Sequence, residues 1–323
     1  MSASVAVGLL MISCINVTEP DGLVPQTADH DPNLPSIVIT VAGKKRVIHT
    51  RTFGDSSLPV LLIVHGSLSD MRSYLVLRVF SDRYHVVFWD MRGNGLSERV
   101  TEEELSYANM VDEFHAIKEH FSPDSQTSII SHSWSAVFCA MYIQKYPDDI
   151  RQAVLMEPIG LKDEFMKNVG QALNLTTSGY LEMSWASDMM TSREHETLDY
   201  RMLAMLSSGV RNFSCDPDNL PPWPVWRVGG LALIVWERSA LKGTSYSYDW
   251  TGNASRFTGE VLFVGSSCSP IGYKFQEKYN KNVFQNARVL RIEDSGHRLV
   301  TEQPDTLIAG LRGFLQAYKG GAQ

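Results

Sequence analysis

The chain has 323 residues, and 29 Lys and Arg residues against 36 Asp and Glu residues give it a net charge of −7. This acidic balance argues against nucleic-acid binding, and the absence of any apolar run of about 18 residues argues against a membrane-spanning helix. The 4 cysteines form no C-x-x-C pair and the 9 histidines form no H-x-x-x-H pair, so we expect neither a metal site nor a cofactor. The length suits one large α/β domain with an insertion, or two domains.

Residues 1–35 differ from the rest of the chain. The apolar run Val5–Ile15 precedes a polar segment rich in Pro and Asp, which is typical of an export signal followed by a linker. Met11-Ile-Ser-Cys14 also resembles a bacterial lipobox, which implies a lipidated Cys14 that anchors the protein to a membrane. No Lys or Arg precedes the apolar run, and Met11 stands where Leu is usual. We expect an exported protein, periplasmic or membrane-anchored; a cytoplasmic protein with a frayed tail is the alternative.

From residue 36 onward, predicted strands alternate with predicted helices. A hairpin is expected first, with a turn at Ala42-Gly43-Lys44 between strands Ser36–Val41 and Lys45–Thr52. The alternation predicts an α/β fold with a mostly parallel sheet, helices on both faces and functional groups at the carboxyl ends of the strands. The later strands are expected at Val60–Val64, His85–Trp89, Ser128–Ile130, Arg151–Met156, Glu260–Val264 and Ala287–Ile292. Helices are expected at Met71–Phe80, Thr101–His120, from Trp134 onward, near Tyr273–Tyr279 and at Pro304–Tyr318.

Residues 160–250 interrupt this alternation and contain no clear buried strand. They hold helical patterns at Lys162–Leu173, Glu194–Leu206 and Pro224–Trp236, and the segment is too long for a loop. We predict a helical lid that is inserted into a core formed by residues 36–159 and 251–323. Its many aromatic residues and methionines either line a substrate pocket or form the core of the lid itself.

The stretch Ser131-His132-Ser133-Trp134-Ser135 joins a predicted strand to a predicted helix. A serine between two small residues at this point resembles the nucleophile elbow of the α/β-hydrolase superfamily, with Ser133 as the nucleophile. The elbow is so tight that its outer positions must be small. Ser131 and Ser135 stand where glycines are usual and preserve that small size.

Three further motifs resemble the same superfamily and occur in the expected order. His65-Gly66-Ser67 follows a buried strand, as the oxyanion-loop His-Gly motif does, and residues 90–97 (DMRGNGLS) resemble the D-x-R-G-x-G-x-S loop. Ser295-Gly296-His297, followed by Glu302-Gln303-Pro304, resembles the catalytic-histidine loop. The resemblance covers about residues 36–318 and implies the α/β-hydrolase fold. Within the second motif, Asp90 and Arg92 are expected to hold the loop rather than take part in chemistry.

The resemblance implies a division of roles among these residues. Ser133 needs a base to remove its proton during attack, and His297 is placed to act as that base and then as the acid for the leaving group. Negative charge on the attacked carbonyl oxygen needs donors, which we expect to be the backbone N–H groups of Trp134 and of Ser67, after Gly66.

The position of the triad acid departs from the common pattern. The loop after Glu260–Val264, its usual place, contains no carboxylate, whereas Glu157 ends the strand that follows the nucleophile helix. A subset of the superfamily, including haloalkane dehalogenases, takes its acid from this strand, and the segment around Glu157 resembles theirs. We predict that Glu157 is the acid, with a lid-anchoring salt bridge as its alternative role and Asp249 and Asp294 as weaker candidates.

The identity of the predicted nucleophile, a serine, limits the reactions that the chain could catalyse. Haloalkane dehalogenases use Asp, and a serine displacing a halide would give a stable ether, so neither dehalogenation nor epoxide hydrolysis is implied. Proline iminopeptidases share the layout but carry His-Gly-Gly-Pro-Gly where this chain has His65-Gly-Ser-Leu-Ser. An aromatic lid favours apolar groups, so we expect a hydrolase of small to medium carboxylic esters.

Two other functions stay open. One is an amide (aminopeptidase-like) or carbon–carbon bond hydrolase with the same triad. The other is a catalytically silent protein that binds a small ligand. This alternative stays open because serines replace the usual glycines of the elbow and the loop that usually carries the acid has no carboxylate. Export would also permit a disulfide, for which Cys215 and Cys268 are the better pair, since Cys139 lies on the predicted buried helix.

Overall fold

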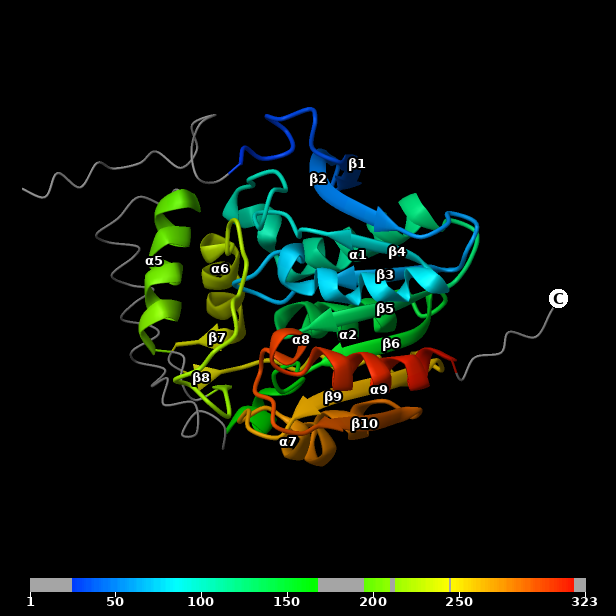
Figure 1. Cartoon of the computed structure of the whole chain (residues 1–323), viewed down its shortest axis with the longest axis vertical. Coiled ribbons are helices and arrows are strands. Elements are labelled where there is room, and N and C mark those ends of the chain that lie inside the picture. The colour runs from blue at the N-terminus through cyan, green and yellow to red at the C-terminus, as the bar shows by residue number, and fades with distance from the viewer. Residues whose placement is uncertain (1–24, 168–194, 210–212, 244, 317–323) are drawn as a thin grey trace, which may run out of the picture.

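The computed structural model describes residues 25–167, 195–209, 213–243 and 245–316. Its centre is an eight-stranded sheet in the order β1-β2-β4-β3-β5-β6-β9-β10 (Figure 1). β1 and β2 pair antiparallel with each other, β2 pairs antiparallel with β4, and the strands from β4 to β10 are parallel. The strands are β1 (Ser36–Val41), β2 (Lys44–Phe53), β3 (Val60–Val64), β4 (His85–Trp89), β5 (Thr127–His132), β6 (Ile150–Met156), β9 (Glu260–Ser266) and β10 (Ala287–Ile292).

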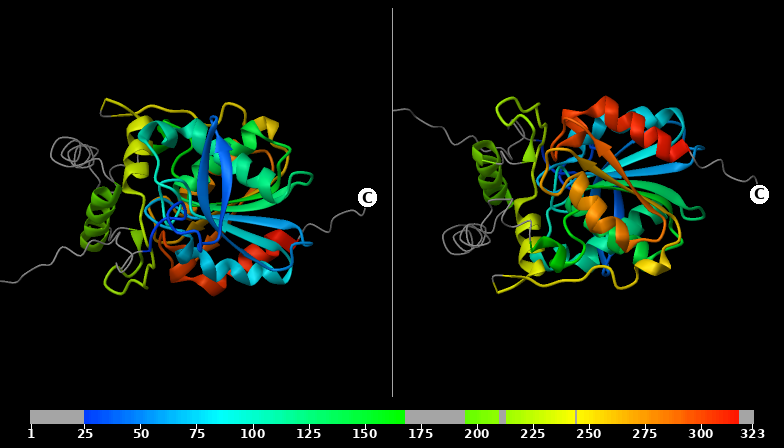
Figure 2. Two further views of the ribbon diagram at one scale, coloured as in Figure 1. Left: turned by 90° about the horizontal axis from the view of Figure 1, so that it is seen from above. Right: turned by 90° about the horizontal axis from the view of Figure 1, so that it is seen from below.

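Helices cover both faces of the sheet (Figure 2). Every residue of β3 is buried, as expected for an apolar strand enclosed on both sides. One face packs against α1 (Tyr107–Phe121) and α2 (Trp134–Lys145), and the other packs against η1 (Met71–Asp82), α8 (Leu299–Glu302) and α9 (Pro304–Gln316). The short helices η2 (Glu102–Leu105), α7 (Tyr273–Lys278) and η5 (Asn280–Val283) complete this part of the chain.

A long insertion separates β6 from β9, which are neighbours in the sheet. In Figures 1 and 2, α5 and α6 lie together at one end of the sheet, with α6 next to the core. α6 also touches the core through the Trp236 indole, which donates to the Leu105 carbonyl. The described elements of the insertion are α3 (Asp163–Met166), α5 (His195–Gly209), α6 (Gly230–Ala240), β7 (Leu241–Lys242), β8 (Ser245–Tyr246) and η4 (Ala254–Arg256).

Two predicted helices differ from the observed ones. The pattern over residues 101–120 is split into η2 and α1, because Ser106 is extended (ψ 150°) and its hydroxyl caps the Asn109 N–H. The helix predicted to begin at Pro224 begins at Gly230, since the Trp226 N–H is taken by the Asp70 carboxylate and Gly229 is left-handed (φ 71°).

Some predictions fall outside the described residues. These include the export signal with Cys14, all within residues 1–24, and the part of the Lys162–Leu173 helix beyond residue 167. Where the structure describes the chain, no helix has the length and apolar character required to cross a bilayer.

Candidate active site

The turn between β5 and α2 has the geometry expected of a nucleophile elbow. Ser133 has φ 57° and ψ −124°, which is a strained conformation for a residue with a side chain. The flanking residue Ser135 is fully buried, and its hydroxyl accepts from the His132 N–H at 2.9 Å. Gly66 passes so close that a Cβ there would lie 3.2 Å from the Ser133 Cβ. The structure therefore puts Ser133 at the carboxyl end of β5, beside the predicted oxyanion loop.

His297 and Glu157, which come from different strand ends, form a close pair. His297 Nδ1 lies 2.6 Å from Glu157 Oε2, and the Glu157 side chain is 0% exposed. Glu157 directly follows β6 and has φ 42°. The structure thus brings together the predicted base and the predicted acid, across 140 residues of sequence.

The other oxygen of Glu157 is held by the last residue of β9. Ser266 donates to Glu157 Oε1 from its backbone N–H at 2.6 Å and from its hydroxyl at 2.5 Å. The loop after β9 lacks a carboxylate, and Ser266 instead orients the carboxylate that directly follows β6. Sequence reasoning missed Ser266, although its position at the end of β9 beside the empty acid loop could have indicated it.

The inserted segment holds the loop that carries His297. The Phe213 carbonyl accepts from the His297 N–H at 2.6 Å, and the two rings lie 5.4 Å apart. A Cβ on Gly296 would come within 1.9 Å of the same carbonyl, so a side chain there would displace Phe213. Glu302 accepts from the Gly296 N–H at 2.8 Å and from the Ser214 hydroxyl at 3.1 Å. These contacts fix the backbone on both sides of the imidazole.

A disulfide joins this part of the insertion to the loop that follows β9. Cys215 pairs with Cys268, as the sequence favoured, and their Cα atoms are 5.2 Å apart. Cys139 is free and buried. The disulfide therefore links the segment that contacts His297 to the loop directly after Ser266, which contacts Glu157.

The predicted oxyanion loop is fixed by buried polar side chains. His65 contacts the Gly66 carbonyl through Nδ1 at 2.7 Å and accepts from the Met91 N–H through Nε2 at 3.0 Å. The Tyr74 hydroxyl accepts from the Gly66 N–H at 3.0 Å and lies 2.5 Å from His132 Nδ1. Tyr74 therefore connects the predicted oxyanion loop to the turn at Ser133. No local sequence motif indicates this contact.

His132 extends this network to the loop that carries His297. Its ring centroid lies 4.5 Å from that of His297. Burial, with a further contribution from His297, lowers the pKa of His132 well below its usual value, so the ring stays neutral. His132 therefore adds no positive charge next to the His297 ring.

Trp134 and Ser67, which carry the predicted oxyanion donors, directly follow Ser133 and Gly66 in the chain. Trp134 is the first residue of α2, so its N–H has no acceptor within the helix. Ser67 follows Gly66 after β3, and the next residue, Leu68, has φ 53°. Left-handed non-glycine residues thus follow β3, β5 and β6, as expected where a site stores backbone strain.

The remaining candidates have structural roles. Asp90 accepts from the Met71 and Leu96 N–H groups, and Arg92 pairs with Glu113 at 2.6 Å, so both hold the loop as predicted. Asp249 pairs with Lys162 at 3.5 Å. Asp294 is exposed.

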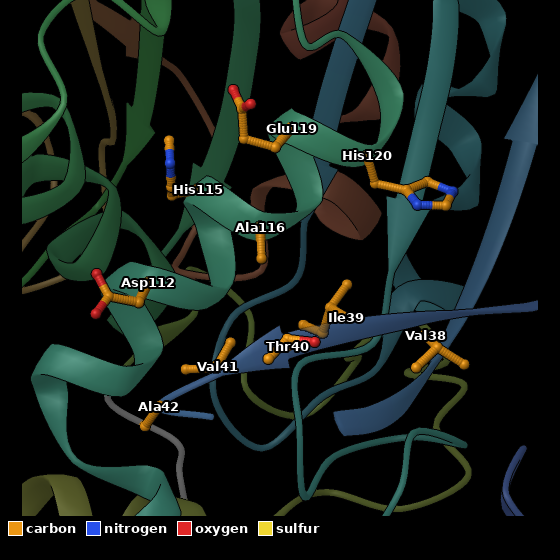
Figure 3. Close-up of a pocket in the computed structure, with 10 residues that line it drawn as sticks. All are labelled: Val38, Ile39, Thr40, Val41, Ala42, Asp112, His115, Ala116, Glu119 and His120. Atoms are coloured by element: carbon orange, nitrogen blue, oxygen red, sulfur yellow. The ribbon is translucent and has the colours of Figure 1, made fainter. Parts of the chain in front are cut away.

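A groove between β1 and α1 is lined by none of these candidate residues (Figure 3). Nearby, His115, Glu119 and Asp149 form the one group that could hold a metal ion among the residues described. Lys118 lies 2.9 Å from Glu119 and 3.9 Å from Asp149, so a cation already pairs with both carboxylates. The groove and this group are therefore poor candidates for a metal site.

The fold and the site define an α/β hydrolase with its polar residues at the carboxyl ends of the strands. The model of the α/β hydrolase fold family matches residues 59–304, and the chain belongs to that family. A candidate esterase/lipase from Haemophilus influenzae is 24% identical over 261 residues, which cover 80% of this chain and 83% of that protein. The chain is thus similar in sequence to an esterase/lipase of this family.

Solved structures agree on the fold. An epoxide hydrolase from Bacillus megaterium superimposes with a TM-score of 0.67 at 18% identity, over 87% of this chain and 100% of the other. A thermophilic esterase from Thermogutta terrifontis gives a TM-score of 0.58 at 20% identity, over 87% and 98%. At these identities the similarity establishes the fold alone. The reaction has to be inferred from the residues of the site.

Proposed function

We propose that the protein is a serine hydrolase that cleaves carboxylic esters of small to medium apolar substrates through an acyl-enzyme. The observation that carries this proposal is the 2.6 Å contact between His297 Nδ1 and Glu157 Oε2, beside a strained serine elbow. The esterase/lipase relative supports the bond type.

The mechanism follows from the protonation of His297. Glu157 accepts the Nδ1 proton, so Nε2 is left as the base that removes the Ser133 proton during attack on the ester carbonyl. The N–H groups of Trp134 and Ser67 stabilise the resulting oxyanion. His297 returns the proton to the leaving alcohol, and a water activated by the same imidazole then hydrolyses the acyl-enzyme.

The helices of residues 160–250 act as a lid in this proposal. α6 packs over the start of α2, where Trp236 and Trp134 have ring centroids 6.2 Å apart. The aromatic residues at this junction exclude water and favour apolar substrate groups. These aromatic residues suit an ester, an amide or a ketone equally. The proposed preference for esters therefore rests on the similarity to the esterase/lipase of Haemophilus influenzae.

A fluorophosphonate probe tests this function against a silent binder. The native protein should be labelled, and Ser133→Ala should remove the labelling while the thermal melt stays unchanged. Ser135→Ala is the matched control and should still be labelled. Labelling that persists in Ser133→Ala would exclude Ser133 as the nucleophile, and a folded native protein that never reacts would favour the binder.

We also propose that the protein acts after export, with Cys14 as a lipid anchor. The disulfide between Cys215 and Cys268 supports an oxidising compartment. Expressed in a bacterium, the protein should partition into detergent, and Cys14→Ala should release it to the aqueous phase. Aqueous partitioning of the native protein would refute the anchor.

A further inference from the structure

The turn that carries Glu157 is strained and needs fixed partners. Glu157 has φ 42°, a left-handed conformation that is unfavourable for a residue with a side chain. Pro158 follows it, and the residue before a proline has a restricted backbone. Strained conformations persist only where the surrounding contacts hold them. The contacts around this turn therefore determine where the Glu157 carboxylate points.

Two neighbouring backbone groups of this turn are held in different ways. The Glu157 N–H donates to the Val264 carbonyl at 2.9 Å, which extends the pairing of β6 with β9 by one residue. The carbonyl of Pro158, a buried residue, instead accepts from a side chain, the Gln276 amide, at 2.8 Å. A buried carbonyl that loses its donor is destabilising. Gln276 therefore fixes the backbone directly after the strained residue.

Gln276 also joins the two segments that hold the Glu157 carboxylate. It is fully buried on α7, which packs beside β9 (Figure 1). Its amide nitrogen donates to the Pro158 carbonyl at 2.8 Å and to the Ile271 carbonyl at 2.8 Å. Ile271 belongs to the loop after Ser266, the residue that donates twice to Glu157. One amide group thus links the turn that carries the predicted acid to the loop that follows its second partner.

The loop between Ser266 and Ile271 is closed by Ser269. The Ser269 N–H donates to the Ser266 hydroxyl at 3.3 Å, and the Ser269 hydroxyl accepts from the Ile271 N–H at 3.3 Å. The Ser266 hydroxyl in turn donates to Glu157 Oε1. Hydrogen bonds therefore run from Gln276 to Glu157 along this loop as well as along the turn at Pro158.

Asn280 fixes the orientation of the Gln276 amide. It is fully buried, and its Nδ2 donates to Gln276 Oε1 at 2.9 Å and to the Ile159 carbonyl at 3.1 Å. Asn280 Oδ1 accepts from the Leu161 N–H at 3.0 Å. Because the Gln276 oxygen receives a donor, its NH2 group faces the two carbonyls. Asn280 thus determines which atom of Gln276 faces Pro158.

We propose that Gln276 is a positioning residue that directs the Glu157 carboxylate toward His297, with Asn280 fixing the Gln276 amide. This rests on the proposed ester hydrolysis, in which Glu157 accepts the Nδ1 proton of His297. The competing role is a brace that stabilises the fold and leaves the site unaffected. A displacement of about 1 Å near a reacting group can lower the rate about a hundredfold, so the two roles lead to different kinetics.

Gln144 supplies a matched control. It is a buried glutamine near the end of α2, and its amide nitrogen donates to the Ala140 and Trp250 carbonyls at 2.8 and 2.7 Å. Its oxygen accepts from the Asn253 N–H at 3.1 Å. Gln276→Met and Gln144→Met each keep the side-chain length and remove a similar set of hydrogen bonds. Both should therefore lower the melting temperature by a similar few degrees, and Gln276→Met alone should alter the site.

The first test does not depend on turnover. The proton on His297 Nδ1 lies in a 2.6 Å contact with Glu157, so its NMR signal should lie far downfield of the backbone amide signals. Glu157→Gln, which removes that proton from Nδ1, identifies the signal by its loss. Gln144→Met should keep the signal at its native position, and Gln276→Met should shift it upfield or broaden it beyond detection. A signal that Gln276→Met leaves unchanged would refute the proposal.

The second test measures hydrolysis of 4-nitrophenyl butyrate by the full-length protein. Gln276→Met should lower kcat by about tenfold to a hundredfold with KM little changed, and Gln144→Met should keep kcat within about threefold. In a Glu157→Gln background, Gln276→Met should lower kcat by no more than about threefold further, because the carboxylate that it positions is absent. Losses that multiply in the double variant would show that Gln276 acts independently of Glu157, and would overturn the proposal.

A second variant covers the case in which Gln276→Met does not fold by circular dichroism. Asn280→Ser removes the amide that orients Gln276, so it should give the same two changes, in the downfield signal and in kcat, to a smaller degree. A folded Asn280→Ser with the native signal and the native kcat would then count against the positioning role.

The outcomes separate this inference from the esterase itself. Ester hydrolysis at a rate that Gln276→Met does not lower more than Gln144→Met overturns the positioning role and leaves the esterase standing. A downfield signal that depends on Gln276 and not on Gln144, in a protein that hydrolyses no ester, supports the positioning role and overturns the esterase.

Discussion

Glu157→Gln is the substitution that examines the proposed triad most closely. In the native protein Glu157 accepts three hydrogen bonds, two from Ser266 and one from His297. A glutamine amide has one oxygen, which the two Ser266 donors require. Its NH2 group then faces His297 Nδ1 and forces the imidazole proton onto Nε2, toward Ser133. In that tautomer His297 cannot act as a base.

The expected loss is on the order of 10³–10⁴ in kcat, with KM little changed. Steady-state hydrolysis of 4-nitrophenyl butyrate measures it, and a thermal melt checks the fold. Asp249→Asn and Asp294→Asn are the matched controls, because both remove a carboxylate outside this pair, and each should keep kcat within about threefold. A near-native Glu157→Gln with either control inactive would refute the assignment.

Three further predictions concern a contact beside the site, the disulfide and an ion pair between β2 and η2. Tyr74→Phe removes the contacts to Gly66 and His132, so kcat should fall by about tenfold with KM unchanged; an unaltered kcat would show that the loop holds its shape without Tyr74. Cys268→Ser opens the disulfide, so the melting temperature should fall by several degrees while kcat stays within about tenfold; equal mobility of the native protein on reducing and non-reducing gels would contradict the bond. Hydrogen bonds from Arg46 hold the pKa of Glu104 at about 2, so Glu104→Gln should lower the free energy of unfolding by about 1–3 kcal/mol at neutral pH. Because the pKa of Glu104 is depressed in the folded state, the difference in free energy of unfolding between the native protein and Glu104→Gln should shrink as the pH falls from about 5 to about 2. A difference in urea melts that does not change with pH would argue against this explanation.

The sequence predicted those parts of the site that are specified locally. The elbow at Ser133 and the His65-Gly66 loop depend on small residues between a strand and a helix, which a short motif records. Glu157 could be predicted because the loop that usually carries the acid contains no carboxylate, whereas a carboxylate stands at the end of the neighbouring strand. The mostly parallel sheet followed from the alternation of apolar runs.

The long-range contacts around the site were not predictable in the same way. Phe213 meets His297, and Tyr74 meets His132, across distances in sequence that only the folded chain closes. The start of α6 was missed because the Trp226 N–H is used by Asp70, a tertiary contact that overrides the helical pattern.

The central claim is a covalent acyl group on Ser133, and trapping that group tests it most directly. Native protein mixed with 4-nitrophenyl butyrate and quenched in acid within the first turnover should gain the mass of one butyryl group. Peptide mapping should place that group on Ser133. Rapid release of nitrophenol with an unmodified Ser133, or with the acyl group on another residue, would contradict the account.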